Sequence, residues 1–207
     1  MILPATKFKK WPTANHHGDD DKMKTNFLLH SVTLMLCATF SFANADTIKA
    51  GDQLKLKSNL HPDLNKRLLY SMNYQLPNLI PVCSDITVNS VKKKEMTFEW
   101  KGVEYTYKYD KHIKKAGVTF QENMQAYFGK TCDEATMQSL SKKDKEGIRF
   151  GRPEVGMSRQ GILFAMGRPP ANVNPDLDAP MYTYWLNRFK RQIIEFDEKG
   201  IVSGIRL

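Results

Sequence analysis

Two cysteines are the residues of this chain best suited to react with each other. Beyond position 45 only Cys83 and Cys132 remain, and an even pair in an oxidising compartment is typical of a disulfide. A redox-active pair would need the C-x-x-C spacing that lowers a thiol pKa, and this pair lacks it. We therefore predict a structural disulfide that closes a loop of about 50 residues and stabilises the fold by ~4 kcal/mol.

The other titratable residues do not form the patterns that metal binding or catalysis needs. His61 and His112 stand alone in the sequence, so no metal site is expected. No G-x-S-x-G or H-E-x-x-H motif occurs, and turn formation explains Asp176 and Asp178 in the segment NPDLDAP. The sequence predicts no catalytic residue, metal or cofactor, and a hydrolase of cell-wall material is the less favoured alternative.

An aromatic strand followed by basic residues is the best candidate for a binding surface. The segment YTYW carries aromatic rings on both faces, and Arg188, Lys190 and Arg191 follow it. Aromatic residues beside arginine are favoured at interfaces. The residues we expect to contact a partner are Tyr184, Trp185, Arg188 and Phe189. An alternative stays open, in which Trp185 packs beneath a neighbouring domain.

A second aromatic group lies in the segment EMTFEWKGVEYTYKYD, which has the pattern of a β-hairpin. A two-residue Lys101-Gly102 loop would place Trp100 opposite Val103 and Phe98 opposite Tyr105. The alternating tyrosines of the second strand, at positions 105, 107 and 109, can form a ligand platform, but a core face is the favoured interpretation.

The N-terminal region has the features of an export signal. Lys24 supplies the positive charge, residues 27–42 are mostly apolar, and Ala43-Asn44-Ala45 matches a signal-peptidase site. A membrane span would need roughly 20 strongly apolar residues. We therefore predict that residues 23–45 are a signal peptide, cleaved after Ala45, and that the protein is periplasmic. Residues 1–22 resemble a purification tag or an upstream extension.

Lipid anchoring and nucleic-acid binding are not expected. Leu36 precedes Cys37 at a position where a lipobox needs a small residue, so the chain is peripheral to a membrane at most. The net charge of +9 at pH 7 favours anionic surfaces, although a general solubilising charge explains it equally well. No aromatic-interleaved basic groove is present. The expected partner is an envelope protein, an anionic lipid or a cell-wall polymer.

Two short helices have clear boundary signals. In the first, Thr119 and Glu122 form a capping box, Phe120 begins an apolar stripe, and Gly129 is expected to end the helix at positive φ. In the segment GMSRQGILFAMGRP, Ser158 caps a helix of about nine residues that ends at Gly167. Its expected buried stripe is Ile162, Leu163 and Met166. Helices this short are unstable alone and must pack against other elements.

The segments that follow the second helix have the patterns of β-strands. MYTYWLN has the composition of a strand, and RQIIEFDEKGIVSGIRL has that of a hairpin with its turn at residues 197–200. From GMSRQGILFAMGRP to this hairpin, the chain resembles the BamE (SmpA/OmlA) family of envelope proteins over roughly residues 140–207. The chain departs from that family in lacking a lipobox cysteine and in carrying an additional β-rich region.

The resemblance implies a module of two helices on a three-stranded antiparallel sheet. The relatives that it implies belong to the machinery that inserts β-barrel proteins into the outer membrane. They bind partner proteins or anionic lipid, and they are not enzymes. The whole chain is then an α+β protein with a β-rich domain containing one packed helix (residues 46–138) and a BamE-like domain (residues 139–207).

The expected function is that of a non-catalytic periplasmic binding or scaffold protein, in outer-membrane protein assembly or envelope integrity. A secreted module resembling enzyme inhibitors is the alternative, because the same fold occurs in such proteins.

Overall fold

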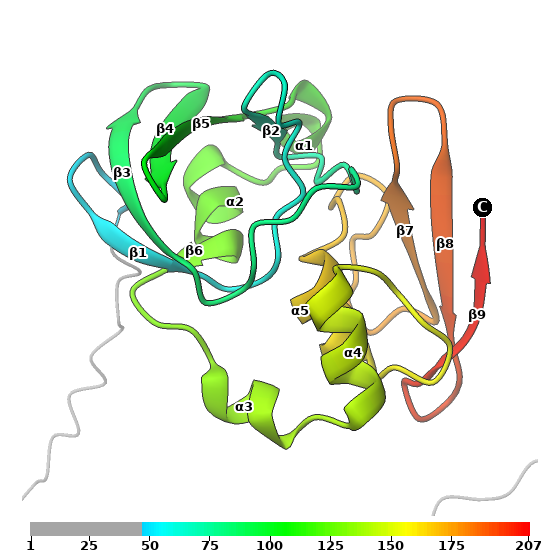
Figure 1. Ribbon diagram of the computed structural model, residues 1–207. Coiled ribbons are helices and arrows are strands. Elements are labelled where there is room, and N and C mark those ends of the chain that lie inside the picture. The colour runs from blue at the N-terminus through cyan, green and yellow to red at the C-terminus, as the bar shows by residue number, and fades with distance from the viewer. Residues whose placement is uncertain (1–46) are drawn as a thin grey trace, which may run out of the picture. The chain divides into compact units, whose positions relative to one another are not determined.

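The computed structural model describes residues 47–207, which fall within a single unit, Ala43–Leu207. The predicted tag or extension (residues 1–22), the signal peptide (residues 23–45) and Asp46 lie outside the described residues. The described part is a mixed α+β structure, as predicted, with a curled six-stranded sheet and a three-stranded antiparallel sheet (Figure 1). Between residues 47 and 207, no helix combines the length and the apolar character needed to cross a membrane.

The six-stranded sheet is built around the predicted hairpin. The hairpin has the expected register, with Trp100 opposite Val103 and Phe98 opposite Tyr105. Its loop residues Lys101 and Gly102 both have positive φ, as a two-residue turn of type I′ requires. The order is β2-β5-β4-β3-β1-β6, with the strands β1 Gln53–Leu56, β2 Leu68–Tyr70, β3 Asp85–Val91, β4 Glu95–Trp100, β5 Val103–Lys108 and β6 Phe128–Gly129.

The tyrosines of β5 face the core of this sheet. Tyr105 and Tyr107 are 4% and 2% exposed, so they form a core face and not a ligand platform. The short helix α1 (Lys111–Lys115) leads to α2 (Phe120–Tyr127), which has the predicted Thr119–Glu122 capping box. α2 covers the sheet, and Phe120 stacks on Tyr107 with ring centroids 6.2 Å apart.

The predicted end of α2 at a positive-φ glycine is wrong. Gly129 is absent from the positive-φ residues and belongs to β6. The chain turns at Phe128, which is extended at φ −120 and pairs with Leu56 of β1. Phe128 is buried against Phe98, with ring centroids 5.5 Å apart. Strand pairing and burial of an aromatic ring therefore determine the end of this helix.

The second half of the chain contains three helices and the smaller sheet. These are α3 (Glu134–Ser139), α4 (Lys142–Phe150) and α5 (Arg159–Met166), followed by β7 (Met181–Trp185), β8 (Arg191–Phe196) and β9 (Val202–Arg206). The predicted turn is present, since Gly200 N–H donates to the Asp197 carbonyl at 2.9 Å. Ser158 caps α5 as predicted, and Gly167 has φ 73. Leu163 is only half-buried, and Phe164 occupies the core in its place.

The C-terminal end of α5 joins the two halves of the chain. The last carbonyls of a helix have no partner within the helix, and here side chains from the first half supply the donors. Asn59 Nδ2 donates to the carbonyls of Ile148 at 2.7 Å and Ala165 at 3.1 Å. Asn73 Nδ2 donates to those of Met166 at 2.7 Å and Arg168 at 3.0 Å. We call this set of contacts the amide junction.

The N-terminal ends of α4 and α5 are joined by one buried carboxylate. Asp144 is 2% exposed, and its Oδ2 accepts hydrogen bonds from Ser141 Oγ at 2.7 Å and Ser141 N at 3.3 Å. Its Oδ1 accepts from Ser158 N at 2.6 Å and Ser158 Oγ at 3.1 Å. A Cβ on Gly161 would lie 2.0 Å from Oδ1, so this approach requires glycine in the first turn of α5.

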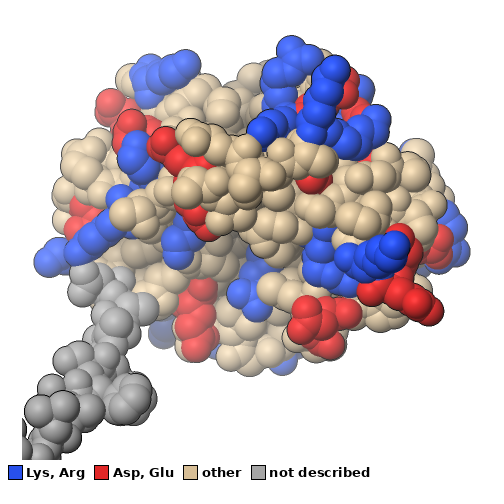
Figure 2. Space-filling model, turned by 90° about the horizontal axis from the view of Figure 1, so that it is seen from below, with Lys and Arg blue, Asp and Glu red and all other residues tan. Residues whose placement is uncertain are grey.

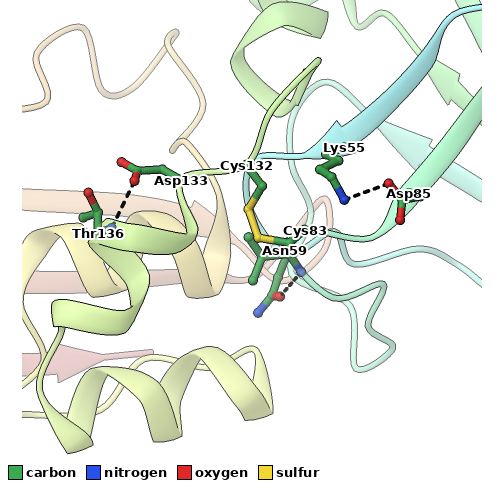
Figure 3. Close-up of a disulfide and its surroundings, with 8 residues drawn as sticks. Lys55, Asn59, Cys83, Asp85, Cys132, Asp133 and Thr136 are labelled. Atoms are coloured by element: carbon green, nitrogen blue, oxygen red, sulfur yellow. Dashed lines mark hydrogen bonds and ion pairs between the residues drawn. A yellow bond between two sulfur atoms is a disulfide. The ribbon is translucent and has the colours of Figure 1, made fainter.

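The structure contains the Cys83–Cys132 disulfide, with a Cα–Cα distance of 5.3 Å and a sequence separation of 49 (Figure 3). It connects the segment before β3 to the segment before α3. Beside it, the N–H of Val82 donates to Asn59 Oδ1 at 2.8 Å. The bond therefore fixes the start of α3 next to one side of the amide junction.

Candidate functional site

The loop between β7 and β8, residues 186–190, is the most exposed aromatic and basic feature of the described chain. We call it the hairpin loop. It lies at the upper end of the small sheet in Figure 1, toward the end of the molecule that carries β2 and α1. Its conformation is set by Asn187, whose Oδ1 accepts hydrogen bonds from the N–H groups of Phe189 at 2.8 Å and Lys190 at 3.0 Å. Such an Asx turn holds the loop in one shape.

Phe189 projects from this loop into solvent. Its exposed fraction is 86%, and the guanidinium carbon of Arg188 lies 5.6 Å from its ring centroid. Phe150, another exposed phenylalanine, is 46% exposed and has Arg149 and Arg152 over its ring at 4.1 and 4.9 Å. Phe189 therefore offers a larger uncovered apolar surface.

Trp185 lies at the base of the hairpin loop and is half-buried. The guanidinium carbon of Arg191 is 5.7 Å from its ring centroid, and its carbonyl accepts a hydrogen bond from Gln75 N–H at 2.8 Å. Its indole Nε1 is buried without a partner among the described residues. Trp185 therefore supports the loop and leaves little of its ring for a partner.

The prediction that Tyr184 contacts a partner does not agree with its burial. Tyr184 is fully buried, and its hydroxyl donates to the Gly167 carbonyl at 2.7 Å. Alternation along β7 places Tyr182 and Tyr184 on the core face, which removes both from the surface. Of the four predicted contact residues, Arg188 and Phe189 are the two that the structure exposes together.

Three cations lie close to Phe189 in the chain, Arg188 and Lys190 in the hairpin loop and Arg191 at the start of β8. Like most described lysines and arginines, they form no ion pair with any residue between 47 and 207, while Lys143 pairs with Glu154 at 2.6 Å and Arg206 with Glu195 at 2.6 Å. The face seen from below mixes both signs of charge across uncharged surface (Figure 2). The segment 186–191, LNRFKR, carries three cations, no carboxylate and one exposed ring.

His61 is structural in this molecule. It is 6% exposed, with Nδ1 3.1 Å from the Leu76 carbonyl and Nε2 3.3 Å from the Ala165 carbonyl of the amide junction. A neutral imidazole can donate to only one of them. Burial lowers the pKa of His61 from its usual 6.5, against a smaller opposite effect of hydrogen bonds to backbone carbonyls. Within the described range, no three His, Cys, Asp or Glu side chains gather closely enough to hold a metal ion.

The lowered pKa of His61 predicts a loss of stability in mild acid. Below the usual pKa of 6.5, the unfolded chain binds a proton that the folded chain still excludes. Stability is therefore lost as the pH falls from 6.5 through the lower folded-state pKa. We expect the melting temperature to fall less between about pH 7.5 and about pH 5 in His61→Gln than in the wild type. His112→Gln is the control, and an equal effect of both variants would contradict the assignment.

Comparisons with known proteins do not place the chain in a family. No family model matches it, and neither a curated protein nor a solved structure matches it. Its function is therefore inferred from the geometry of the hairpin loop and the charges around it.

Proposed function

We propose that this protein is a non-catalytic binding protein of the periplasm that attaches to anionic lipid through its hairpin loop. The observation that carries the proposal is Phe189, which is 86% exposed, has Arg188 beside its ring at 5.6 Å, and is followed in the chain by Lys190 and Arg191. An aromatic ring beside basic side chains suits the boundary between lipid headgroups and acyl chains. Arginine can also bind a lipid phosphate through two parallel hydrogen bonds.

The magnitude of this attachment is modest. Burying a phenylalanine side chain contributes about 2 kcal/mol, and each cation near an anionic surface contributes about 1 kcal/mol. With the three cations Arg188, Lys190 and Arg191, the total is about 5 kcal/mol, which corresponds to weak and reversible binding. The proposed attachment is therefore peripheral.

The BamE resemblance supports the same proposal. Two helices, α4 and α5, precede the three strands β7, β8 and β9 in the chain, which is the order that the resemblance implies for residues 139–207. We propose a BamE-like module in this part of the protein, and a role in outer-membrane protein assembly or envelope integrity. The β-rich residues 46–138 would then hold this module in place through the amide junction.

Vesicle binding tests the hairpin loop directly. We expect the protein to sediment with vesicles that contain phosphatidylglycerol and to remain in solution with vesicles of phosphatidylcholine alone. Arg188→Glu removes one cation and adds an anion, which should cost ~2 kcal/mol of binding energy, or about thirtyfold in affinity. Phe189→Ala should cost a similar amount through lost burial of its ring, about 2 kcal/mol.

A matched control separates the loop from general charge. Lys199→Glu makes the same change of charge at an exposed position in the β8–β9 turn, at the opposite end of β8. All three variants should melt like the wild type, since the three side chains are exposed. Lipid docking is overturned if the wild type binds neither vesicle, or if Arg188→Glu and Lys199→Glu weaken binding equally.

A further inference from the structure

A cleft with a volume of about 400 Å³ lies between α2 and the loop that follows α5. Its volume is within the usual range for small-molecule sites, about 300 to 1,000 Å³. Side chains of α2 form one wall, and residues 168–175 form the other. The cleft is remote in sequence from the hairpin loop and has no part in the proposed lipid attachment.

A buried amide supplies a free donor on the α2 wall. Asn123 is 7% exposed, and its Oδ1 accepts a hydrogen bond from the Tyr107 hydroxyl at 2.7 Å. Burial raises the pKa of Tyr107 well above its usual value, so this hydroxyl keeps the proton that it donates. The amide nitrogen of Asn123 is left without a partner among residues 47–207, and Asn123 lines the cleft. A ligand oxygen in the cleft can accept a hydrogen bond from this nitrogen.

A cation lines the opposite wall. The backbone of Arg168 is fixed by its carbonyl, which accepts from Asn73 Nδ2 at 3.0 Å and from the Tyr127 hydroxyl at 2.8 Å. Burial raises the pKa of Tyr127, and the nearby positive charge of Arg168 opposes that rise. Arg168 and Tyr127 both line the cleft, and Arg168 pairs with no carboxylate of the described chain.

A carboxylate completes the set of charged groups. Glu122 lines the cleft, and its Oε2 accepts hydrogen bonds from Thr119 N at 2.7 Å and Thr119 Oγ1 at 2.8 Å. These hydrogen bonds lower the pKa of Glu122, so it is ionised at neutral pH. Its Oε1 makes no hydrogen bond with residues 47–207 and is available to a donor on a ligand.

The loop wall is rigid before any ligand arrives. Pro169, Pro170 and Pro175 restrict its backbone. Asn174 ties it to β7, accepting from Thr183 N–H at 2.7 Å and donating to the Thr183 carbonyl at 2.8 Å. A preformed wall reduces the ordering cost of binding.

We propose that this cleft binds a small zwitterion of about the size of a dipeptide. Its carboxylate would pair with Arg168 and accept a hydrogen bond from Asn123 Nδ2, and its ammonium group would pair with Glu122. The groups of both signs come from two rigid walls on opposite sides of the cleft. The proposal assigns binding only and includes no chemical step.

A nuclear magnetic resonance titration with L-alanyl-L-alanine tests the cleft. We expect saturable shifts of the backbone amides of Ala126 and Ala171, one on each wall. Two analogues remove one charge each, the C-terminal amide of the dipeptide and its N-acetyl derivative. Each should bind at least about tenfold more weakly, as expected for the loss of one charged contact.

Variants of the chain provide the second arm of the test. Arg168→Gln should weaken dipeptide binding at least about tenfold, while Lys114→Gln, an exposed cation on α1 that does not line the cleft, should leave it unchanged. Asn123→Asp keeps the acceptor for Tyr107 and repels the ligand carboxylate. If Asn123→Asp does not fold, the dipeptide affinity of Arg168→Gln tests the proposal. Absence of saturable shifts, or equal effects of Arg168→Gln and Lys114→Gln, would overturn the proposal.

Discussion

Gly167→Ala is expected to lower the melting temperature by about 10 °C, which corresponds to about 4 kcal/mol of unfolding free energy. Gly167 ends α5 with φ 73 and ψ −179, a backbone conformation that is nearly exclusive to glycine. An added Cβ would lie 2.9 Å from Tyr127 Cε1, 3.0 Å from Ser58 Oγ and 3.1 Å from Asn73 Nδ2. Backbone strain and overpacking each contribute about 1 to 3 kcal/mol.

Gly102→Ala is the control for this prediction. Gly102 has φ +75 in the hairpin turn between β4 and β5, and nothing lies within 4 Å of an added Cβ. This variant carries a conformational penalty alone, about 1 kcal/mol. The melting temperatures of the two variants are compared by circular dichroism. Equal decreases in melting temperature would show that crowding at the amide junction does not add to the conformational penalty.

Asp144→Ala should destabilise the protein by about 3 kcal/mol, because it removes a buried carboxylate that accepts hydrogen bonds at the N-termini of both helices. The lost acceptor serves Ser141 at the start of α4 and Ser158 at the start of α5. Anions at helix N-termini are also stabilised by the helix dipoles, and Asp144 lies at two of them. Chemical denaturation should show a lower midpoint.

Asp133→Ala is the matched control for Asp144→Ala. Asp133 caps α3 by accepting from Thr136 N–H at 3.0 Å, and it is exposed. Loss of an exposed cap costs about 1 kcal/mol. If Asp144→Ala is no worse than Asp133→Ala, the shared carboxylate does not connect the two helices energetically.

The elements that sequence patterns predicted correctly are those with local signals. The hairpin register, the capping box at Thr119 and the cap at Ser158 each depend on residues a few positions apart. The amide junction has no such signal, since Asn73 Nδ2 meets a carbonyl 93 positions away. Ser141-x-x-Asp144 is a local capping pattern, but nothing in it indicates that Asp144 also reaches Ser158, 14 positions further on.

The candidate site was predictable only in part for the same reason. Aromatic residues occupy both faces of β7, so alternation alone could not tell whether Tyr184 or Trp185 faces the core. Beyond the strand, Arg188 and Phe189 have no neighbouring strand to cover them, and their exposure follows from the turn at Asn187. The cleft was missed because Asn123 and Arg168 come from segments that approach each other only in the folded chain.

The amide junction also determines how the polypeptide can be divided. Residues before position 139 supply the donors Asn59 and Asn73, while residues after it supply the acceptors, the carbonyls of Ala165 and Met166. A chain cut between α3 and α4 would therefore leave two fragments, each with buried polar groups that only the other can satisfy. The two fragments are therefore complementary. Expressed from separate genes, they suit a split reporter, in which two pieces reassemble when the molecules that carry them come close together.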